Sequence, residues 1–200
     1  MHIEFLVEDL STEAALELLV PKIVDVGTSF ATHVFGSKST LLAKLEARLR
    51  SYSHWLPPTW RIIVVVDEDR ADCRAIKKKL ESASRAATLK TKGAAKGKPF
   101  SILNRIAIEE LEAWFFGDVP AIGAAYPGVP LTLASKARYR DSDAIGGGTW
   151  EALERVLQGA GHHLGGLQKI RAAREIATFM NPSLNTSKSF RVFRDGLLAL

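Results

Sequence analysis

Cysteine is nearly missing from this sequence, and long apolar runs are missing altogether. Cys73 is the single cysteine among 200 residues, which excludes an intrachain disulfide and a cysteine-based zinc cluster. No apolar run approaches the roughly 18 residues that suggest a membrane span. The first residues also lack the basic segment followed by an apolar one that marks a signal peptide. We therefore expect a cytoplasmic protein with no membrane partner.

Acidic residues are the less abundant charged class. Lysine and arginine total 27 while aspartate and glutamate total 22, which gives a formal net charge of +5. This excess leaves two interpretations open, because an ordinary solvated surface explains it as well as a protein that binds a polyanion does. The apolar fraction of 46% is typical of a folded globular protein.

Short apolar runs alternate with helical periodicity in the first half of the chain. Residues 62–66 are a continuous apolar run, residues 3–7 are an apolar run interrupted only at Glu4, and "SFATHVFG" and "FSILNRIA" indicate two further strands. Continuous apolar strands separated by helical segments are typical of a parallel sheet that is buried on both faces. The sequence therefore predicts an α/β fold over residues 1–116, with a doubly wound, mainly parallel four-stranded sheet.

Residues 117–200 have a different character. Glycine-rich turns such as "IGGGTW" and "GAGHHLGG" interrupt them, and helical spacing is found near 149–158 and 167–180. No segment there has the pattern of a strand. We expect this part to be a helical extension packed on the α/β core.

Local signals predict where several elements begin and end. We expect Ser11 or Thr12 to cap the first helix and Ser39 to cap the second. Pro21 should kink or restart the first helix, and Cys73 should lie on the apolar side of the third. The segment "TLKTKGAAKGKPF" has no periodicity and is expected to be a mobile loop.

Carboxylates follow two of the predicted strands directly. Glu8 comes after the run at 3–7, and Asp67 and Asp69 follow the run at 62–66. In an open parallel sheet, ligands bind beyond the carboxyl ends of the strands. Acidic groups this close repel one another unless a cation intervenes, and carboxylate oxygens are the ligands that Mg²⁺ or Mn²⁺ prefers. The sequence therefore predicts a Mg²⁺ or Mn²⁺ site, suited to phosphate chemistry, at this edge.

The same segments resemble known families. A Glu that ends the first strand and an Asp-x-Asp that ends the third resemble the Toprim fold of topoisomerases, bacterial primases and the nuclease domains of overcoming-lysogenization-defect proteins. More narrowly, four segments are similar to the Toprim-like DUF4276 family, in the family's order: "FLVEDLSTEAAL", "VVVDEDRADCRAIKKKLE", "IAIEELEAWFFGD" and "AREIATFMNPSLNTSKSFRVFRDGL".

This resemblance implies a metal-dependent nuclease. Glu8 would be the general acid or base, and Asp67 and Asp69 would be ligands of Mg²⁺ or Mn²⁺. The implied substrate is nucleic acid, with DNA ahead of RNA. Some members of the group lie beside ATPases in what look like split bacterial defence systems, which implies an ATPase as protein partner.

Further acidic residues have two interpretations each. Asp9 stands where Toprim sequences commonly have glycine, and it either extends the metal site or begins a helix. Asp72 suits a helix cap as well as it suits a metal ligand. Glu112, in "EAW", fits the family pattern better than Glu109 or Glu110, and it is either a further ligand or a charge at a helix start.

Basic residues in two segments are the candidates for nucleic-acid contacts. The first segment is the predicted mobile loop. A solvated loop that binds no partner is an equally good interpretation of it. The second is "LNTSKSFRVF", where Ser187 or Ser189 could instead cap the last helix. The candidate residues are Lys90, Lys92, Lys96, Lys98, Lys188 and Arg191.

Two functions stay open at this point. The acidic set of Glu8, Asp67 and Asp69 favours the nuclease, whereas Asp9 in place of glycine favours a non-catalytic binding or regulatory module that acts through a protein partner. A phospho-accepting receiver domain is disfavoured, because its lysine–proline corner follows a fifth strand and Lys98 precedes the fourth. Adjacent His162 and His163 lack other ligands at a suitable spacing, so we expect no metal there.

Overall fold

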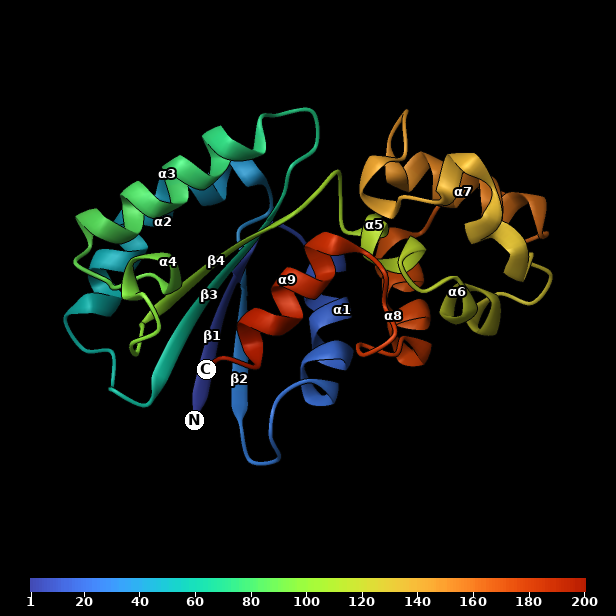
Figure 1. Ribbon diagram of the computed structural model, residues 1–200. Helices are drawn as coiled ribbons and strands as arrows, with labels where there is room; N and C mark the ends of the chain where they lie inside the picture. Colours follow the sequence, from blue (N-terminus) through green and yellow to red (C-terminus); the bar gives the residue numbers. More distant parts are fainter.

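The computed structural model describes residues 1–200 and contains a four-stranded, all-parallel sheet in the order β2-β1-β3-β4 (Figure 1). The central strands are buried almost throughout, which is why their sequences are mainly apolar. Helical crossovers join the strands, so the α/β prediction is confirmed and the fold is consistent with a Toprim-like doubly wound arrangement. The strands are β1 (His2–Val7), β2 (Ser29–Val34), β3 (Trp60–Asp67) and β4 (Ile102–Ala107).

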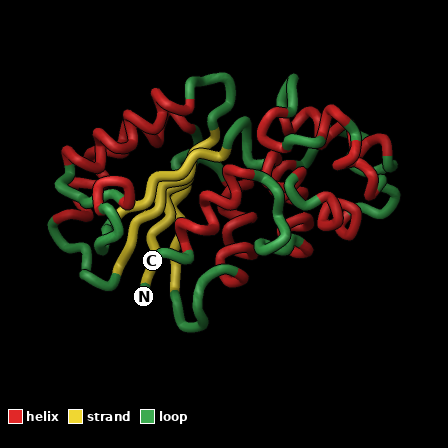
Figure 2. The backbone as a smooth tube through the Cα atoms, viewed as in Figure 1, coloured by secondary structure: helices red, strands yellow, loops and turns green.

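Helices cover both faces of the sheet (Figure 2). On one face, α2 (Lys38–Ser53) and α3 (Cys73–Ala86) pack over a core of 13 buried apolar residues that includes Leu6. On the other, α1 (Leu10–Leu19) and α9 (Lys188–Leu197) pack over a core of 35 that includes Phe5. Successive residues of a strand point to opposite faces, so β1, β3 and β4 each contribute to both cores.

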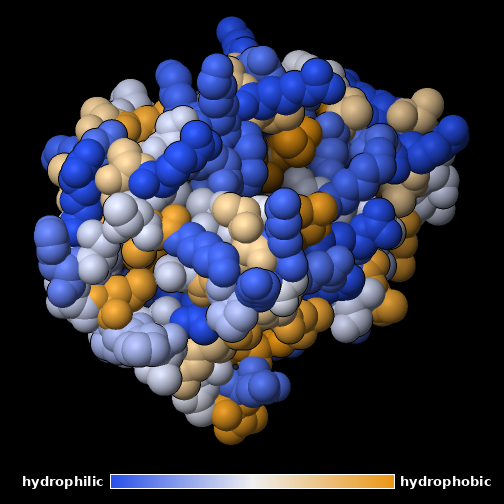
Figure 3. Space-filling model, turned by 60° about the vertical axis from the view of Figure 1, so that its left-hand side comes forward, coloured by the Kyte–Doolittle hydropathy of each residue, from blue (hydrophilic) through white to orange (hydrophobic).

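One side of α3 faces the sheet and the other faces solvent. Ile76 and Leu80 are buried against the sheet, whereas the opposite side carries exposed basic residues. Hydrophilic residues gather in the upper part of the view in which this side of the molecule comes forward (Figure 3). Cys73, expected among the apolar residues, is only half-buried because it is the first residue of the helix. The exposed basic residues are Arg74, Lys78, Lys79 and Arg85.

The start and end of α1 differ from the sequence prediction. Asp9 caps the helix in place of Ser11 or Thr12, and its Oδ1 accepts a hydrogen bond from the N–H of Thr12 at 2.8 Å. The helix follows β1 so closely that Asp9 is the first residue with a short acceptor side chain in the cap position. Pro21 lies in a 3-10 turn, Val20–Lys22, so the proline follows the helix and does not kink it.

Two further predictions of local structure were wrong. Ser37, not Ser39, caps α2, because the helix already begins at residue 38. The segment expected to be a mobile loop contains the short helix α4 (Lys92–Ala95), which Thr91 caps. Ala95 is buried against the sheet core, which fixes a segment whose sequence shows no periodicity.

The segment after β4 forms a helical layer beside the sheet (Figure 1). As predicted, this layer contains no strand. The larger core runs without a break from Phe5 in the sheet to Leu153 and Ile176 in the layer. None of the helices has both the length and the apolar character needed to cross a bilayer. The elements are α5 (Glu112–Phe116), α6 (Val119–Ala125), the 3-10 turns η2 (Leu131–Ser135), η3 (Ala137–Tyr139) and η4 (Ser142–Ala144), α7 (Thr149–Gly159) and α8 (Lys169–Phe179).

After α8 the chain returns to the sheet as α9, which lies over β4 (Figure 1). The contact is close at Gly196, where a Cβ would stand 2.7 Å from Cδ2 of Leu103 and from Nη2 of Arg105. Arg105 also donates from Nε to the backbone oxygen of Val192 at 3.0 Å. The last helix therefore completes the cover of the sheet although it comes after the helical layer.

The segment that precedes α9 crosses the end of α5 at Gly117. A Cβ on this glycine would stand 2.2 Å from Oδ1 of Asn185 and 2.7 Å from the backbone nitrogen of Ser187. Asn185 is buried, donates from Nδ2 to the backbone oxygen of Trp114 at 2.7 Å, and accepts from the N–H of Ser187 at 2.9 Å. Glycine is therefore needed at position 117 because the two segments touch there.

A charged residue is buried midway along β1. Glu4 is 6% exposed and lies on the side of the sheet that α2 covers. Its carboxylate accepts a hydrogen bond from the hydroxyl of Tyr52 at 2.6 Å and contacts Nε2 of His33 at 2.5 Å and Nε2 of His2 at 2.9 Å. Burial by itself raises the pKa of Glu4, but these hydrogen bonds outweigh it and hold the pKa below its usual value.

We expect the Glu4 contacts to make the stability depend on pH. Because the folded-state pKa is lowered, the stabilisation is present above the unfolded value of 4.5 and is lost as the pH falls through the folded-state pKa. Glu4→Gln should lower the free energy of unfolding at pH 7 by about 1.5–3 kcal/mol, and the deficit should shrink below pH 4.5. Urea unfolding across this range measures it, with the exposed Glu46→Gln as control. A deficit that is the same at every pH would contradict the assignment.

Candidate functional site

Glu8 and Asp67 meet at the carboxyl edge of the sheet. Glu8 follows the last residue of β1, Asp67 is the last residue of β3, and these strands are neighbours in register (Figure 1). Oε1 of Glu8 accepts a hydrogen bond from the backbone N–H of Asp67 at 2.9 Å. Both residues are buried, at 7% and 9% exposure. The structure thus places the two predicted residues side by side.

Burial and mutual repulsion act on both carboxyls. Burial raises the pKa of Glu8, the charges of Asp69 and Asp9 raise it further, and the hydrogen bond from Asp67 together with Lys38 counteracts part of this. For Asp67, burial and the charge of Glu8, then that of Glu112, raise the pKa well above its usual range. Glu8 and Asp67 therefore bind protons more readily than free carboxylic acids do. This behaviour is expected of carboxyls in a cation-binding site that holds no cation.

Glu112 joins this pair from the helical layer. It is the first residue of α5, is 4% exposed, and its charge is among those that raise the pKa of Asp67. Burial raises the pKa of Glu112 to about 7, although Lys169 at the start of α8 lowers it. Glu112 therefore begins a helix and also lies with the sheet-edge carboxyls, so both sequence interpretations apply to it.

Asp69 lies at the same edge but is held by a lysine. Nζ of Lys38 donates to Oδ2 of Asp69 at 2.5 Å, to the backbone oxygen of Asp67 at 3.1 Å and to that of Glu68 at 2.9 Å. Asp69 has a positive φ of 52°, so the turn after β3 aims its side chain back toward α2. We call Glu8, Asp67, Asp69 and Glu112 the carboxylate site.

Sequence analysis did not identify Lys38. A signal was available in "GSKST", because a lysine that follows a cap serine directly after a strand must lie at the carboxyl edge of the sheet. The residue supplies the positive charge that partly offsets the carboxylate site. Its three hydrogen bonds also fix the turn that carries Asp69.

The structure uses two other acidic candidates as helix caps. Oδ1 of Asp9 bonds to the first turn of α1, although its charge still contributes to the raised pKa of Glu8. Asp72 is exposed, and its Oδ1 accepts a hydrogen bond from the N–H of Arg74 at 2.8 Å at the start of α3. Asp9 thus lies close to the carboxylate site, whereas Asp72 acts as the cap that its position suggested.

Neighbouring glutamates brace the loops around the site. Glu68 accepts hydrogen bonds from the N–H of Cys73 and from the N–H of Glu109, both at 3.2 Å, and so ties the loop after β3 to the loop after β4. Oε2 of Glu110 accepts from the N–H of Thr149 and of Trp150 at 2.9 Å, and so holds the start of α7. Through these hydrogen bonds Glu110 has a structural role in the metal-free protein.

The donor set of the carboxylate site suits a hard divalent cation. Its members are oxygen donors only, the charges of neighbouring members raise the pKa values of Glu8 and Asp67, and Lys38 is the cation bonded to one of them. As the side chains stand, no group of three acidic, histidine or cysteine side chains is arranged around a common metal position. Metal ligation would need Asp69 to turn from Lys38.

A pocket of about 450 Å³ opens beside the carboxylate site, and we call it the edge pocket. It lies between the loops that follow β3 and β4 and the start of α7. Asp69, Arg70, Glu110 and Trp150 are among its lining residues. Sequence analysis missed Arg70 and Trp150, because a single arginine and a single tryptophan give no pattern that distinguishes a pocket from a surface.

The predicted nucleic-acid contacts divide between the two edges of the sheet. Lys90, Lys92, Lys96 and Lys98 precede β4, so they lie at the amino edge, opposite the carboxylate site. One strand of this length separates the edges by roughly 20 Å. Lys188 and Arg191 lie in the first turn of α9, and Lys188 lines a pocket with Ile108, the residue that follows the carboxyl end of β4.

The serines near Lys188 have a structural role. Ser187 caps α9, as one of the two sequence interpretations proposed, and its hydroxyl donates to Oδ1 of Asp143 at 2.7 Å. Ser189 accepts a hydrogen bond from Nε1 of the buried Trp114 at 3.1 Å. Nζ of Lys188 pairs with the exposed Asp141 at 2.8 Å, which keeps the ammonium group on the surface.

Comparison with known proteins gives one match. The family model described as "Domain of unknown function (DUF4276)" matches residues 7–198, which is nearly the whole chain. No curated protein and no solved structure matches the chain.

Proposed function

This chain belongs to the DUF4276 family, and we propose that it is a Mg²⁺- or Mn²⁺-dependent enzyme that cleaves phosphodiester bonds in nucleic acid. The observation that carries this proposal is the convergence of Glu8, Asp67 and Glu112 at the carboxyl edge of an all-parallel sheet. The proposal includes a Toprim relationship, a site in the cytoplasm, DNA ahead of RNA as substrate, and an ATPase partner in bacterial defence. These four parts rest on the resemblance of the sequence segments to Toprim-like proteins and on composition.

The residues of the site would divide the work. Asp67 and Asp69 would hold the cation, which when bound polarises a phosphoryl oxygen and lowers the pKa of a water molecule. Glu8 keeps Oε2 free while Oε1 accepts the N–H of Asp67, and its raised pKa suits a group that takes up and returns a proton. Glu112, with a pKa of about 7, would be a further ligand or a proton acceptor.

Cationic side chains at the same edge would hold the nucleic-acid backbone. Lys38 and Arg70 border the site, and Lys188 and Arg191 lie on the same side of the sheet. Each phosphate contact would weaken as salt rises, because binding releases condensed counterions. The lysines at the amino edge would contact only a strand that extends beyond the site.

Metal binding tests the proposal directly. Calorimetric titration with Mn²⁺ should show binding by the native protein and none by the double variant Asp67→Ala plus Asp69→Ala. A plasmid and a labelled RNA, each incubated with Mn²⁺ or Mg²⁺, then show whether cleavage follows and which nucleic acid is cut. Binding that survives in the double variant would place the metal elsewhere and overturn the proposal.

A non-catalytic module that works through a protein partner is the second candidate. The ion pair between Lys38 and Asp69 favours it, because the lysine already supplies a cation where a metal ligand is expected. Asp9 is committed to its helix cap, which also fits a site that holds no metal. No Mn²⁺ binding at millimolar metal, and no cleavage, would support this alternative.

Removing Lys38 distinguishes the two functions. If Asp69 is a metal ligand, Lys38→Met should tighten Mn²⁺ binding about two- to fivefold, because a competing, partly exposed ion pair is lost. Lys44→Met, which removes the same charge from the exposed side of α2, is the matched control and should change the affinity little. The same affinity in Lys38→Met and in the control would show that Asp69 takes no part in metal binding.

A further inference from the structure

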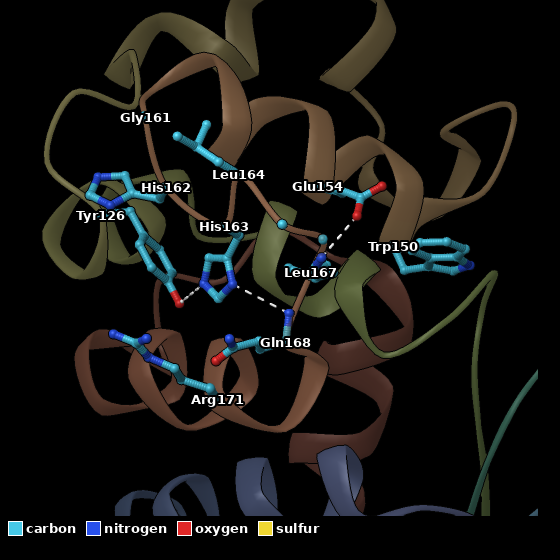
Figure 4. A pocket seen from close by; sticks show the side chains of 12 residues that line it. Tyr126, Trp150, Glu154, Gly161, His162, His163, Leu164, Leu167, Gln168 and Arg171 are labelled. Atoms are coloured by element: carbon cyan, nitrogen blue, oxygen red, sulfur yellow. Dashed lines mark hydrogen bonds between the residues drawn. The ribbon is translucent and has the colours of Figure 1, made fainter.

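A second cavity lies in the helical layer and has a volume of about 690 Å³ (Figure 4). Its walls are the glycine-rich loop between α7 and α8, the start of α8 and the aromatic ring of Tyr126. We call it the loop cavity. Its size falls within the roughly 300–1,000 Å³ of ligand sites. Aromatic and polar side chains line it together: Tyr126, Trp150, His162, His163, Gln168 and Arg171.

Hydrogen bonds on both ring nitrogens fix His163 in the wall of the loop cavity (Figure 4). Nδ1 accepts from the N–H of Gln168 at 3.3 Å, so Nε2 carries the proton and donates to the hydroxyl of Tyr126 at 2.8 Å. Glu175 lies near the Tyr126 hydroxyl, where it adds to the effect of burial in raising the pKa of Tyr126, and it accepts a hydrogen bond from Nε of Arg171 at 2.8 Å. Both nitrogens of His163 are therefore engaged, and the residue holds the shape of the loop.

The same loop presents donors that have no acceptor in the chain. The backbone N–H groups of His163, Leu164 and Gly165 make no hydrogen bond, whereas those of the following residues are paired. The side-chain amide of Gln168 is exposed, and Arg171 pairs with Glu175 through Nε, which leaves its terminal nitrogens free. Free donors beside aromatic rings suit a ligand that has both an anionic group and a flat base.

Two residues, Trp150 and Lys169, lie between the loop cavity and the carboxylate site. Trp150 lines both the loop cavity and the edge pocket. Nζ of Lys169 lies 4.7 Å from the centre of the Trp150 ring, and its charge acts on Glu112. A strand whose phosphate reaches the carboxylate site would therefore pass Trp150 and reach the loop cavity.

We propose that the loop cavity binds an unpaired nucleotide of the strand that is cut at the carboxylate site, an inference that rests on the proposed function. Arg171 and the free N–H groups contact the phosphate, while the base lies among the aromatic rings and the amide of Gln168. A base in a duplex is stacked and paired, and both interactions must be broken before it can be flipped out. The enzyme therefore prefers single strands, or duplexes with an unpaired end, over intact duplex.

Binding of two matched probes tests this inference. The probes are a fluorescein-labelled 15-nucleotide single strand of DNA and the blunt duplex of the same sequence, both in EDTA so that no cleavage occurs. Fluorescence anisotropy should show at least about tenfold tighter binding of the single strand. Trp150→Ala and Arg171→Ala should each weaken single-strand binding about five- to 50-fold, the size of losing one base stack or one charge-assisted phosphate contact, and leave duplex binding nearly unchanged.

The control and the metal titration separate the possible outcomes. Arg155→Ala removes an exposed cation from α7 outside the loop cavity and should leave both affinities unchanged. Equal losses in Arg155→Ala and Arg171→Ala, or equal affinity of the native protein for both probes, would overturn the inference. Mn²⁺ titration of the same proteins reports on the carboxylate site alone. Metal binding without a preference for the single strand would reject the nucleotide site in the loop cavity and leave the proposed function intact. A preference for the single strand without metal binding would reject the proposed function and leave the nucleotide site intact.

Discussion

Asp67→Asn should abolish metal-dependent cleavage and leave the fold at least as stable as before. Loss of a ligand that holds the cation removes several kcal/mol of transition-state stabilisation, which corresponds to a decrease in rate on the order of 10³-fold. The fold should not weaken, because burial and the neighbouring Glu8 and Glu112 make the ionised Asp67 unfavourable in the metal-free protein. Activity and stability should therefore change in opposite senses.

The direction of the expected change in stability follows from the raised pKa of Asp67. A carboxyl whose folded-state pKa is above its unfolded value stabilises the fold at low pH, and this contribution is lost as the pH rises through the folded-state pKa. Asparagine never ionises, so the advantage of Asp67→Asn in melting temperature should be greatest at alkaline pH in EDTA. Asp25→Asn, on the surface, is the matched control. A clear loss of stability in Asp67→Asn would show that the ionised carboxylate has a structural partner.

Gly117→Ala should lower both the stability of the fold and the metal affinity. The new Cβ would stand 2.2 Å from Oδ1 of Asn185, so either α5 or the segment before α9 must move. Overpacking of this kind costs about 1–3 kcal/mol, which lowers the melting temperature of a chain of this size by about 3–10 °C. The displacement would also disturb α5, the helix that begins with Glu112, so metal affinity should fall with stability.

Gly159→Ala is the matched control for this substitution. Gly159 is the last residue of α7, has no atom near the position of a Cβ, and has an ordinary backbone conformation. Alanine there should be neutral or slightly stabilising, by up to about 1 kcal/mol. Thermal unfolding of both variants measures the difference. Equal melting temperatures would mean that the contact between Gly117 and Asn185 relaxes without cost.

The α/β core was predictable because its strands are determined by short, contiguous patterns in the sequence. The mainly apolar runs at 3–7 and 62–66 can be buried on both faces only as central strands of a parallel sheet. The ends of such strands meet at one edge, so the proximity of Glu8 and Asp67 followed from the order of elements before any coordinates. Helix starts were less certain, because several short polar residues compete for one cap position and only the geometry of the preceding turn decides.

The helical layer and much of the site depend on contacts between distant segments. Glu110 holds the start of α7 from 39 residues away, and Asn185 holds α5 from 71 residues away. Neither pairing leaves a periodic signal in the sequence. The lysines at 90–98 were grouped with the site because they are basic, and only the strand direction shows that they lie at the other edge.

The return of α9 to the sheet has a consequence for synthesis on the ribosome. Phe190 and Phe193 of this helix pack on the ring of Trp114, and Gly196 closes against Leu103. The residues of α9 cannot cover β4 and α5 until they have left the ribosome. Until then, the apolar surface of β4 and α5 stays exposed on the nascent chain. Nascent chains of this protein should therefore bind chaperones that recognise such surface, and release from them should follow the emergence of α9.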